Sequence, residues 1–139
     1  MTSEDIGGLT QLPKNNTITF VTSSNKDVMV LKELGFPAIC FNGESYGINK
    51  ASKSYAVAKS VLDALKKRSK YLILFLDSDE PGLKATLGMA QAHKLMWVTT
   101  REGGPKDISD YYKKYGRKKT FRLVKKLIKK KVINEEVPY

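Results

Sequence analysis

The sequence predicts a small α/β domain with a mostly parallel central sheet of about four strands flanked by helices. Short β-branched or apolar runs alternate with helical patterns along most of the chain, which is the order that βαβ units produce. Residues 71–76 form a continuous apolar and aromatic run, typical of a strand buried on both faces. The length of 139 residues suits a single domain.

Four segments have the composition of strands. Residues 17–22 are β-branched and aromatic, and residues 38–41 are a short apolar run that ends at an Asn-Gly turn signal. The buried run at 71–76 is the third, and residues 96–99 are the fourth. Residues 1–16 are polar and are interpreted as a lead-in strand or arm outside the core.

Three segments between these strands have helical patterns. Residues 26–34 carry apolar side chains on one face and end before Gly35, a helix stop signal. Residues 52–68 are the longest pattern, and residues 83–93 follow a Pro-Gly pair. Strands that alternate with helices form parallel sheets with right-handed crossovers. Ligands in such sheets collect at the carboxyl ends of the strands.

The composition excludes several classes of protein and favours a polyanionic partner. No apolar run approaches the length of a transmembrane helix, and the acidic start does not resemble a signal peptide. The single cysteine, Cys40, cannot form an internal disulfide, which suits a reducing cytoplasm. The 25 Lys and Arg residues against 14 Asp and Glu give a net charge of +11. Nucleic acid is the first expected partner, ahead of an anionic membrane.

Two carboxylates follow the most buried predicted strand. Asp77 and Asp79 are two residues apart after the run at 71–76, so both project to the same side while the chain is extended. Paired carboxylates at a strand end suit a hard cation such as Mg²⁺ or Mn²⁺. The alternative is structural: Asp79 caps the next helix and Asp77 is a solvated turn residue. The position between a buried strand and Pro-Gly favours the metal.

The segment after the first strand offers hydroxyl groups at a predicted helix N-terminus. Ser23 and Ser24 precede Lys26 and Asp27, and free backbone N–H groups at such a position suit a phosphate. An ordinary serine helix cap explains the same residues equally well.

These segments together resemble a Toprim domain, the catalytic fold of bacterial-type primases, topoisomerases and some nucleases. The resemblance rests on Thr-Ser-Ser-Asn-Lys-Asp at 22–27, Asn-Gly-Glu at 42–44, Asp-Ser-Asp-Glu-Pro-Gly at 77–82 and Lys-Asp-Ile-Ser-Asp-Tyr at 106–111. It extends over residues 17–115, most of the chain, and phage primases and primase-helicases are the most similar subgroup.

The resemblance implies metal-assisted nucleotidyl transfer by a phage or bacterial replication protein in the host cytoplasm. Asp77, Asp79 and Asp107 would hold Mg²⁺ or Mn²⁺, while Asp27 would act nearby or orient the serine loop. Lys26 and Lys50 would neutralise phosphate. The implied partners are single-stranded DNA or a primer-template, nucleoside triphosphates, and other primase or helicase domains.

One position departs from the family pattern. A glutamate usually stands four residues before the Asp27 position, and here that residue is Ser23, which cannot act as a general base or supply negative charge to a metal. Either Glu44 replaces the missing carboxylate, or the domain is catalytically degenerate and only binds nucleic acid. A small metal-dependent nuclease is a third reading.

The C-terminal segment concentrates the positive charge. Residues 116–139 are predicted to form a basic amphipathic helix that packs on or extends the domain, because Phe121, Val124, Leu127 and Ile128 recur at helical spacing. Residues 111–131 contain no acidic residue. The side chains expected to contact nucleic acid there are Lys113, Lys114, Arg117, Lys118, Lys125 and Lys126, with Tyr111, Tyr112 and Tyr115 available for base stacking.

Overall fold

The computed structural model describes residues 6–7, 16–41, 53–100 and 105–136. Its centre is a five-stranded sheet in the order β1-β3-β2-β4-β5. The strands are β1 (Ile6–Gly7), β2 (Asn16–Thr22), β3 (Ala38–Phe41), β4 (Ser69–Phe75) and β5 (Met96–Trp97). Pairings among β2, β3, β4 and β5 are all parallel, and only the two-residue β1 at the edge is antiparallel. The predicted α/β fold with a mostly parallel sheet is confirmed.

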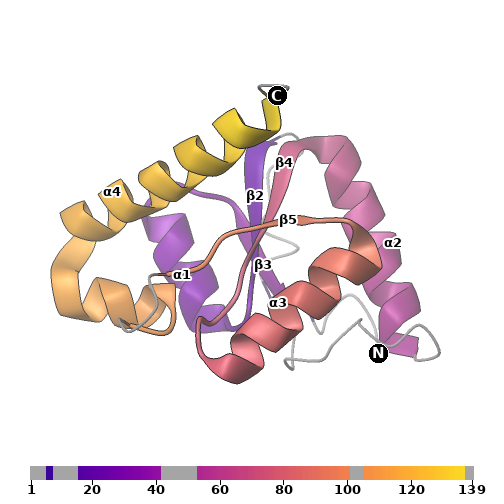
Figure 1. The fold of residues 1–139 in the computed structure, drawn as a ribbon, viewed down its shortest axis with the longest axis horizontal. Helices are drawn as coiled ribbons and strands as arrows, with labels where there is room; N and C mark the ends of the chain where they lie inside the picture. The colour runs from indigo at the N-terminus through magenta and orange to yellow at the C-terminus, as the bar shows by residue number, and fades with distance from the viewer. Residues whose placement is uncertain (1–5, 8–15, 42–52, 101–104, 137–139) are drawn as a thin grey trace.

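Four helices flank this sheet (Figure 1). They are α1 (Asn25–Glu33), α2 (Lys53–Arg68), α3 (Glu80–His93) and α4 (Ile108–Glu136). One core cluster includes Leu62 and Met89 and belongs to the α2 and α3 side, whereas a second includes Leu31 and Val124 and belongs to the α1 and α4 side. The sheet is therefore buried on both faces, as the apolar β4 sequence predicts.

The start of α3 differs from the prediction. The helix begins at Glu80 rather than Leu83, because the Asp79 carboxylate accepts a hydrogen bond of 2.9 Å from the Gly82 N–H. Pro81 therefore lies in the first turn, where its missing N–H costs no helical hydrogen bond. The Pro-Gly pair belongs to the helix and not to a turn before it.

The basic C-terminal helix begins earlier than residue 116 and is interrupted. Helix α4 runs from Ile108, and Gly116 within it has φ 82° and ψ 176°, a conformation that glycine adopts far more readily than other residues. Helix α4 packs against α1. In its second segment Phe121 stacks on Phe36, which follows α1, with ring centroids 5.7 Å apart, and Val124 is fully buried.

Among the described residues, every helix is too short or too polar to cross a lipid bilayer.

Candidate metal centre

The carboxyl ends of β2 and β4 lie side by side at the centre of the sheet. The last residues of the two strands, Thr22 and Phe75, are paired in register. Ser23 and Asp77 therefore leave the sheet at the same edge, and the Ser23 hydroxyl donates a hydrogen bond of 2.7 Å to Asp77 Oδ1. This edge is where the parallel-sheet rule predicts a ligand.

Asp27 is brought to this edge by the first turn of α1. Ser24 caps the helix: its hydroxyl oxygen accepts from the Asp27 N–H and donates to Asp27 Oδ2 at 3.2 Å. The structure therefore agrees with the alternative interpretation of Ser24 as a helix cap, and contact of Ser24 with phosphate stays a prediction. Asp27 is only 1% exposed, so its carboxylate points into the protein and not toward solvent.

Asp107 reaches the same place from the segment before α4. Its Oδ1 accepts a hydrogen bond of 2.8 Å from the Asp110 N–H in the first turn of that helix. The segment is fixed to the residue after Asp77, because the Ser78 N–H donates to the Lys106 carbonyl at 2.6 Å. Thr100 adds hydrogen bonds to the Ser78 hydroxyl and to the Pro105 carbonyl. Asp107 is therefore held opposite the end of β4.

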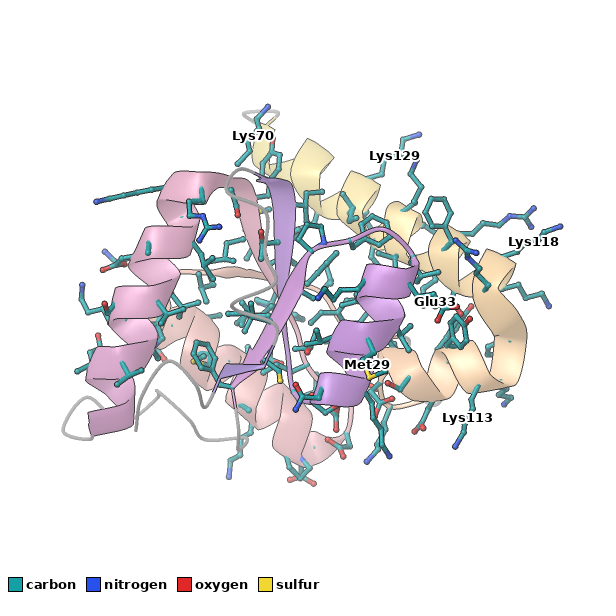
Figure 2. The ribbon with its side chains drawn as sticks, turned by 180° about the vertical axis from the view of Figure 1, so that it is seen from behind. Met29, Glu33, Lys70, Lys113, Lys118 and Lys129 are labelled. Carbon is teal, nitrogen blue, oxygen red and sulfur yellow. The ribbon has the colours of Figure 1, made fainter. Side chains whose placement is uncertain are left out.

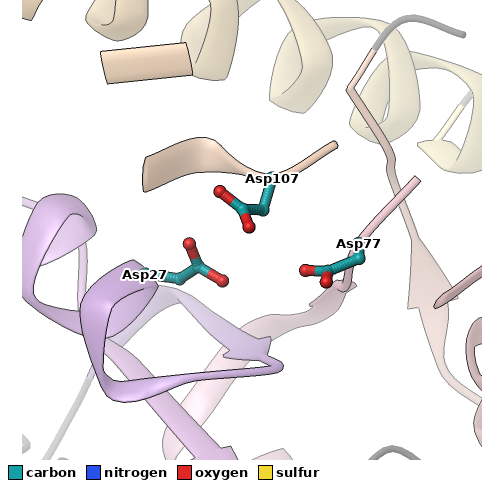
Figure 3. A group of neighbouring side chains, drawn as sticks. All are labelled: Asp27, Asp77 and Asp107. Carbon is teal, nitrogen blue, oxygen red and sulfur yellow. The ribbon is translucent and has the colours of Figure 1, made fainter. Parts of the chain in front are cut away.

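The three carboxylates converge although they come from distant parts of the chain. One oxygen from each of Asp27, Asp77 and Asp107 lies within 4.8 Å of the other two (Figure 3). Carboxylate oxygens at such separations match the ligands that Mg²⁺ and Mn²⁺ prefer. The donor set fits a divalent cation, and the acidic triad is a candidate metal site.

The environment of the triad disfavours three simultaneous negative charges. The pKa of Asp27 is raised from its usual 3.8 to about 6, mainly by burial and also by the neighbouring carboxylates of Asp107 and Asp77, against the opposing hydrogen bonds from Ser109. Burial also raises the pKa of Asp77. A divalent cation would relieve this repulsion.

Several donors hold the carboxylates in place without a metal. Ser109 donates two hydrogen bonds to Asp27 Oδ1, from its N–H at 3.1 Å and its hydroxyl at 2.7 Å. Lys106 Nζ lies 3.9 Å from Asp77 Oδ2. The Ser109 hydrogen bonds fix the orientation of the Asp27 carboxylate, whereas the Lys106 side chain is 54% exposed and makes only this long contact with Asp77.

The predicted site residues divide into three groups. Asp27, Asp77 and Asp107 meet, whereas Asp79 stands close enough to raise the pKa of Asp77 but caps α3 outside the group of three. Glu44 and Lys50 lie outside the described residues. The sequence interpretation gave Asp27 a supporting role and did not place it among the candidate metal ligands, where the structure puts it. Its place five residues beyond the end of β2 was the available signal.

A groove of about 420 Å³ adjoins the triad between α1 and the first segment of α4. Ser109 lines it and also binds Asp27, and Lys26 and Lys113 are among the other lining residues. An exposed Met29 side chain contributes apolar surface (Figure 2).

The outward face of α4 is strongly cationic. Lys113, Lys118 and Lys129 project from this helix away from the body of the protein (Figure 2). The exposed basic residues of the helix are Lys113, Lys114, Arg117, Lys118, Lys119, Arg122, Lys125, Lys126, Lys129 and Lys130. Tyr112 does not belong to this face, because its hydroxyl donates to Glu33 Oε1 at 3.0 Å.

The fold resembles that of a phage primase. It matches the primase fragment of the bacteriophage T7 primase-helicase protein with a TM-score of 0.61, at 18% identity over 85% of this chain and 47% of that one. It also matches a structure of the T7 lagging-strand DNA polymerase interacting with two primase domains bound to an RNA/DNA hybrid and dTTP. There the TM-score is 0.53, at 18% identity over 83% of this chain and 55% of the other.

The chain spans about half the length of these two structures. No protein-family model and no curated protein sequence matches it. The structural comparison therefore establishes the fold, and the residues of the acidic triad and the groove are the evidence for what the domain binds.

Proposed function

We propose that this chain is a Toprim-type domain of a primase-like phage replication protein, which binds a divalent metal at the acidic triad and nucleic acid and nucleotide beside it. The convergence of Asp27, Asp77 and Asp107 at the carboxyl edge of the sheet carries this proposal. The primase-like fold and the cationic face of α4 support it.

Asp27, Asp77 and Asp107 would hold Mg²⁺ or Mn²⁺, and Asp79 stands near enough to add charge or a water-mediated contact. When bound, such an ion would bring a nucleotide triphosphate to the site and stabilise the charge that develops during phosphoryl transfer. The residues of this chain position the ligands: Ser109 orients Asp27, and Ser23 orients Asp77.

The cationic side chains would bind the polyanion. Lys26 and Lys113 line the groove next to the triad, where a nucleotide phosphate would lie close to both. The lysines along α4 would contact the phosphate backbone of a template or primer. Lysine predominates over arginine there, which favours phosphate contact over reading of base edges.

Catalysis requires a group that Ser23 does not supply. Glu44 remains our proposed substitute, because it follows β3, whose carboxyl end lies at the same edge as that of β2. The second candidate function is a module that binds nucleic acid without catalysis. This non-catalytic function is favoured by Ser23, which donates a hydrogen bond to Asp77 at the position where the family resemblance leads us to expect a carboxylate.

The remaining partners are proposed from the resemblance to primases. Because the chain spans about half of the two matching structures, we propose that primer synthesis requires other primase or helicase domains, in the cytoplasm of a bacterial host. Substitution of Glu44→Gln in the assembled primase tests the catalytic assignment. Normal primer synthesis by that variant would exclude Glu44.

Titration with Mn²⁺, followed by calorimetry, tests the metal site directly. We expect the wild type to bind Mn²⁺ and the Asp77→Asn variant to bind at least tenfold more weakly, since a charged ligand is lost. Asp63→Asn is the matched control, because Asp63 is an exposed carboxylate of α2 paired with Lys59. Equal Mn²⁺ binding by all three proteins, or none by the wild type, would overturn the proposed metal site.

A further inference from the structure

Two aromatic side chains are exposed on the cationic helix. The described part of the chain exposes five large hydrophobic side chains, and the aromatic ones among them are Tyr115, 39% exposed, and Phe121, 38% exposed. The sequence pattern assigned Phe121 to the buried stripe of α4. The structure instead leaves more than a third of its surface open to solvent.

Lysine ammonium groups lie over both rings, two over Tyr115 and one over Phe121. Lys114 Nζ and Lys119 Nζ lie 5.4 and 5.6 Å from the centroid of Tyr115, and Lys125 Nζ lies 5.5 Å from the centroid of Phe121. These ammonium groups are within the range of cation–π attraction. An arriving base would displace these flexible, exposed lysine side chains from the ring faces, and their ammonium groups would then lie beside the base within reach of its phosphate.

Each exposed ring also packs against a second aromatic ring. Phe121 stacks on Phe36, with an angle of 26° between the ring planes. Tyr115 packs against Tyr111, with centroids 4.6 Å apart. Gly116 separates the two helical segments that carry the exposed rings, and Thr120 fixes the junction by donating to the Gly116 carbonyl at 2.7 Å. Rings held in this way lose little conformational freedom when a ligand stacks on them.

We propose that an unpaired nucleic-acid strand binds along α4 with bases stacked on Tyr115 and Phe121 and phosphates contacted by Lys114, Lys119 and Lys125. This inference rests on the proposed function in one respect, namely that the polyanion is nucleic acid. It adds the side chains of α4 that would contact the strand, and it requires that the strand be single there, because the bases of a duplex are stacked on one another and are not free to cover a protein ring.

Helix α4 connects the exposed rings to the acidic triad. Helix α4 begins at the acidic triad, where Asp107 caps it, and Tyr115 lies two turns further along. A strand held by Tyr115 and Phe121 would be directed toward the groove and the triad. The absence of acidic residues between Tyr111 and Lys131 favours nucleic acid over a protein partner.

Fluorescence anisotropy with labelled oligo-dT, oligo-U and a DNA duplex of equal length tests this inference in the intact chain. We expect Tyr115→Leu with Phe121→Leu to weaken binding of the single strands by about tenfold or more and to leave duplex binding unchanged. The slope of affinity against salt should also be unchanged, because no charge is removed. A variant with Lys125→Gln and Lys126→Gln should instead flatten that slope.

Leu87→Ala serves as the matched control, because Leu87 is 58% exposed but lies on α3. Phe121 contacts Phe36, so Tyr115→Leu alone, which leaves that stack intact, is measured as well. Tyr115→Phe should retain binding. Tyr115→Trp should add a fluorescence signal that oligo-dT quenches, beyond the signal of the single native Trp97.

The outcomes separate the two proposals. Wild-type binding to single strands that is unaffected by the Tyr115 and Phe121 substitutions would overturn the stacking inference and leave the proposed function intact. A wild type that binds none of the three nucleic acids would overturn the nucleic-acid part of the proposed function itself. Binding only to an acidic protein would place α4 in a protein interface and contradict the inference.

Discussion

The Ser23 hydroxyl donates a 2.7 Å hydrogen bond to Asp77 Oδ1 across 54 positions of sequence. This contact joins the ends of two neighbouring parallel strands, β2 and β4. It places a neutral donor where the Toprim resemblance leads us to expect a carboxylate. The candidate metal site is therefore one carboxylate short of the pattern that the resemblance implies.

Replacement of Ser23 by glutamate should strengthen metal binding. We expect Ser23→Glu to bind Mn²⁺ about tenfold more tightly than the wild type at pH 8, because a further negative ligand would stand beside Asp77. Without metal, the same change should lower the thermal stability through repulsion between the carboxylates. Calorimetric titration and thermal melting measure the two effects. Ser23→Gln has similar size without the charge, and equal affinity of the two variants would contradict the prediction.

Substitution of Asp27 by asparagine should stabilise the metal-free protein at pH 8. The pKa of Asp27 is about 6 in the folded protein against a usual 3.8, so the folded state binds more protons than the unfolded state between these values. Its contribution to the free energy of unfolding therefore falls as pH rises from about 4 to about 6 and is level above that. An asparagine oxygen can still accept the hydrogen bonds from Ser109.

Chemical denaturation in EDTA at pH 4 and pH 8 tests this effect. We expect a gain on the order of 1–3 kcal/mol for Asp27→Asn at pH 8 and a much smaller gain at pH 4. The control is Asp63→Asn, since Asp63 is exposed and its pKa is lowered by Lys59. A wild type that gains stability from pH 4 to pH 6 relative to Asp27→Asn would show that the sign is wrong.

Addition of a methyl group at Gly82 should disturb the triad. A Cβ atom there would lie 2.2 Å from the Asp77 carbonyl oxygen, and backbone atoms cannot yield as a flexible side chain can. We expect Gly82→Ala to cost about 3 kcal/mol or more and to weaken Mn²⁺ binding. Urea denaturation and calorimetry measure these effects.

Gly35→Ala is the control for the Gly82 substitution. Gly35 has φ 94°, and no atom lies within 4 Å of the position its Cβ would take, so only backbone strain of about 1 kcal/mol is expected. Its Mn²⁺ affinity should match the wild type. Similar losses of Mn²⁺ affinity in both variants would indicate a general effect of instability and not a displaced Asp77.

Truncation of Val124 should loosen α4 from the domain. Val124 is fully buried against the α1 side of the sheet, so Val124→Ala should cost about 1–2 kcal/mol from lost burial and the cavity left behind. Lys126→Ala, on the exposed face, should change the free energy of unfolding by less than about 0.5 kcal/mol. Urea denaturation compares the two. Equal stabilities would show that the helix is not part of the cooperative fold.

Much of the fold followed from local pattern. The strand predicted at 38–41 matches β3, and the helix predicted at 52–68 begins one residue later as α2. The predicted helix boundary was wrong where the same residues are common in two kinds of local structure. The Pro81-Gly82 pair suits a turn or a helix start, and the Asp79 cap decided for the helix. Phe121 fitted the apolar stripe by spacing, but its ring stacks on Phe36 and leaves more than a third of its surface exposed, whereas Val124 in the same segment is fully buried.

The sequence by itself determined the order of strands and helices, the parallel sheet, the cationic C-terminal helix and the edge at which polar groups gather. These properties depend on periodicity, charge and the direction of the strands, which neighbouring residues specify. Only the tertiary structure decided that Asp27 joins Asp77 and Asp107 while Asp79 caps α3. Pairing of β2 with β4 and docking of α4 on α1 bring together residues 80 positions apart, and such pairing depends on packing across the whole domain.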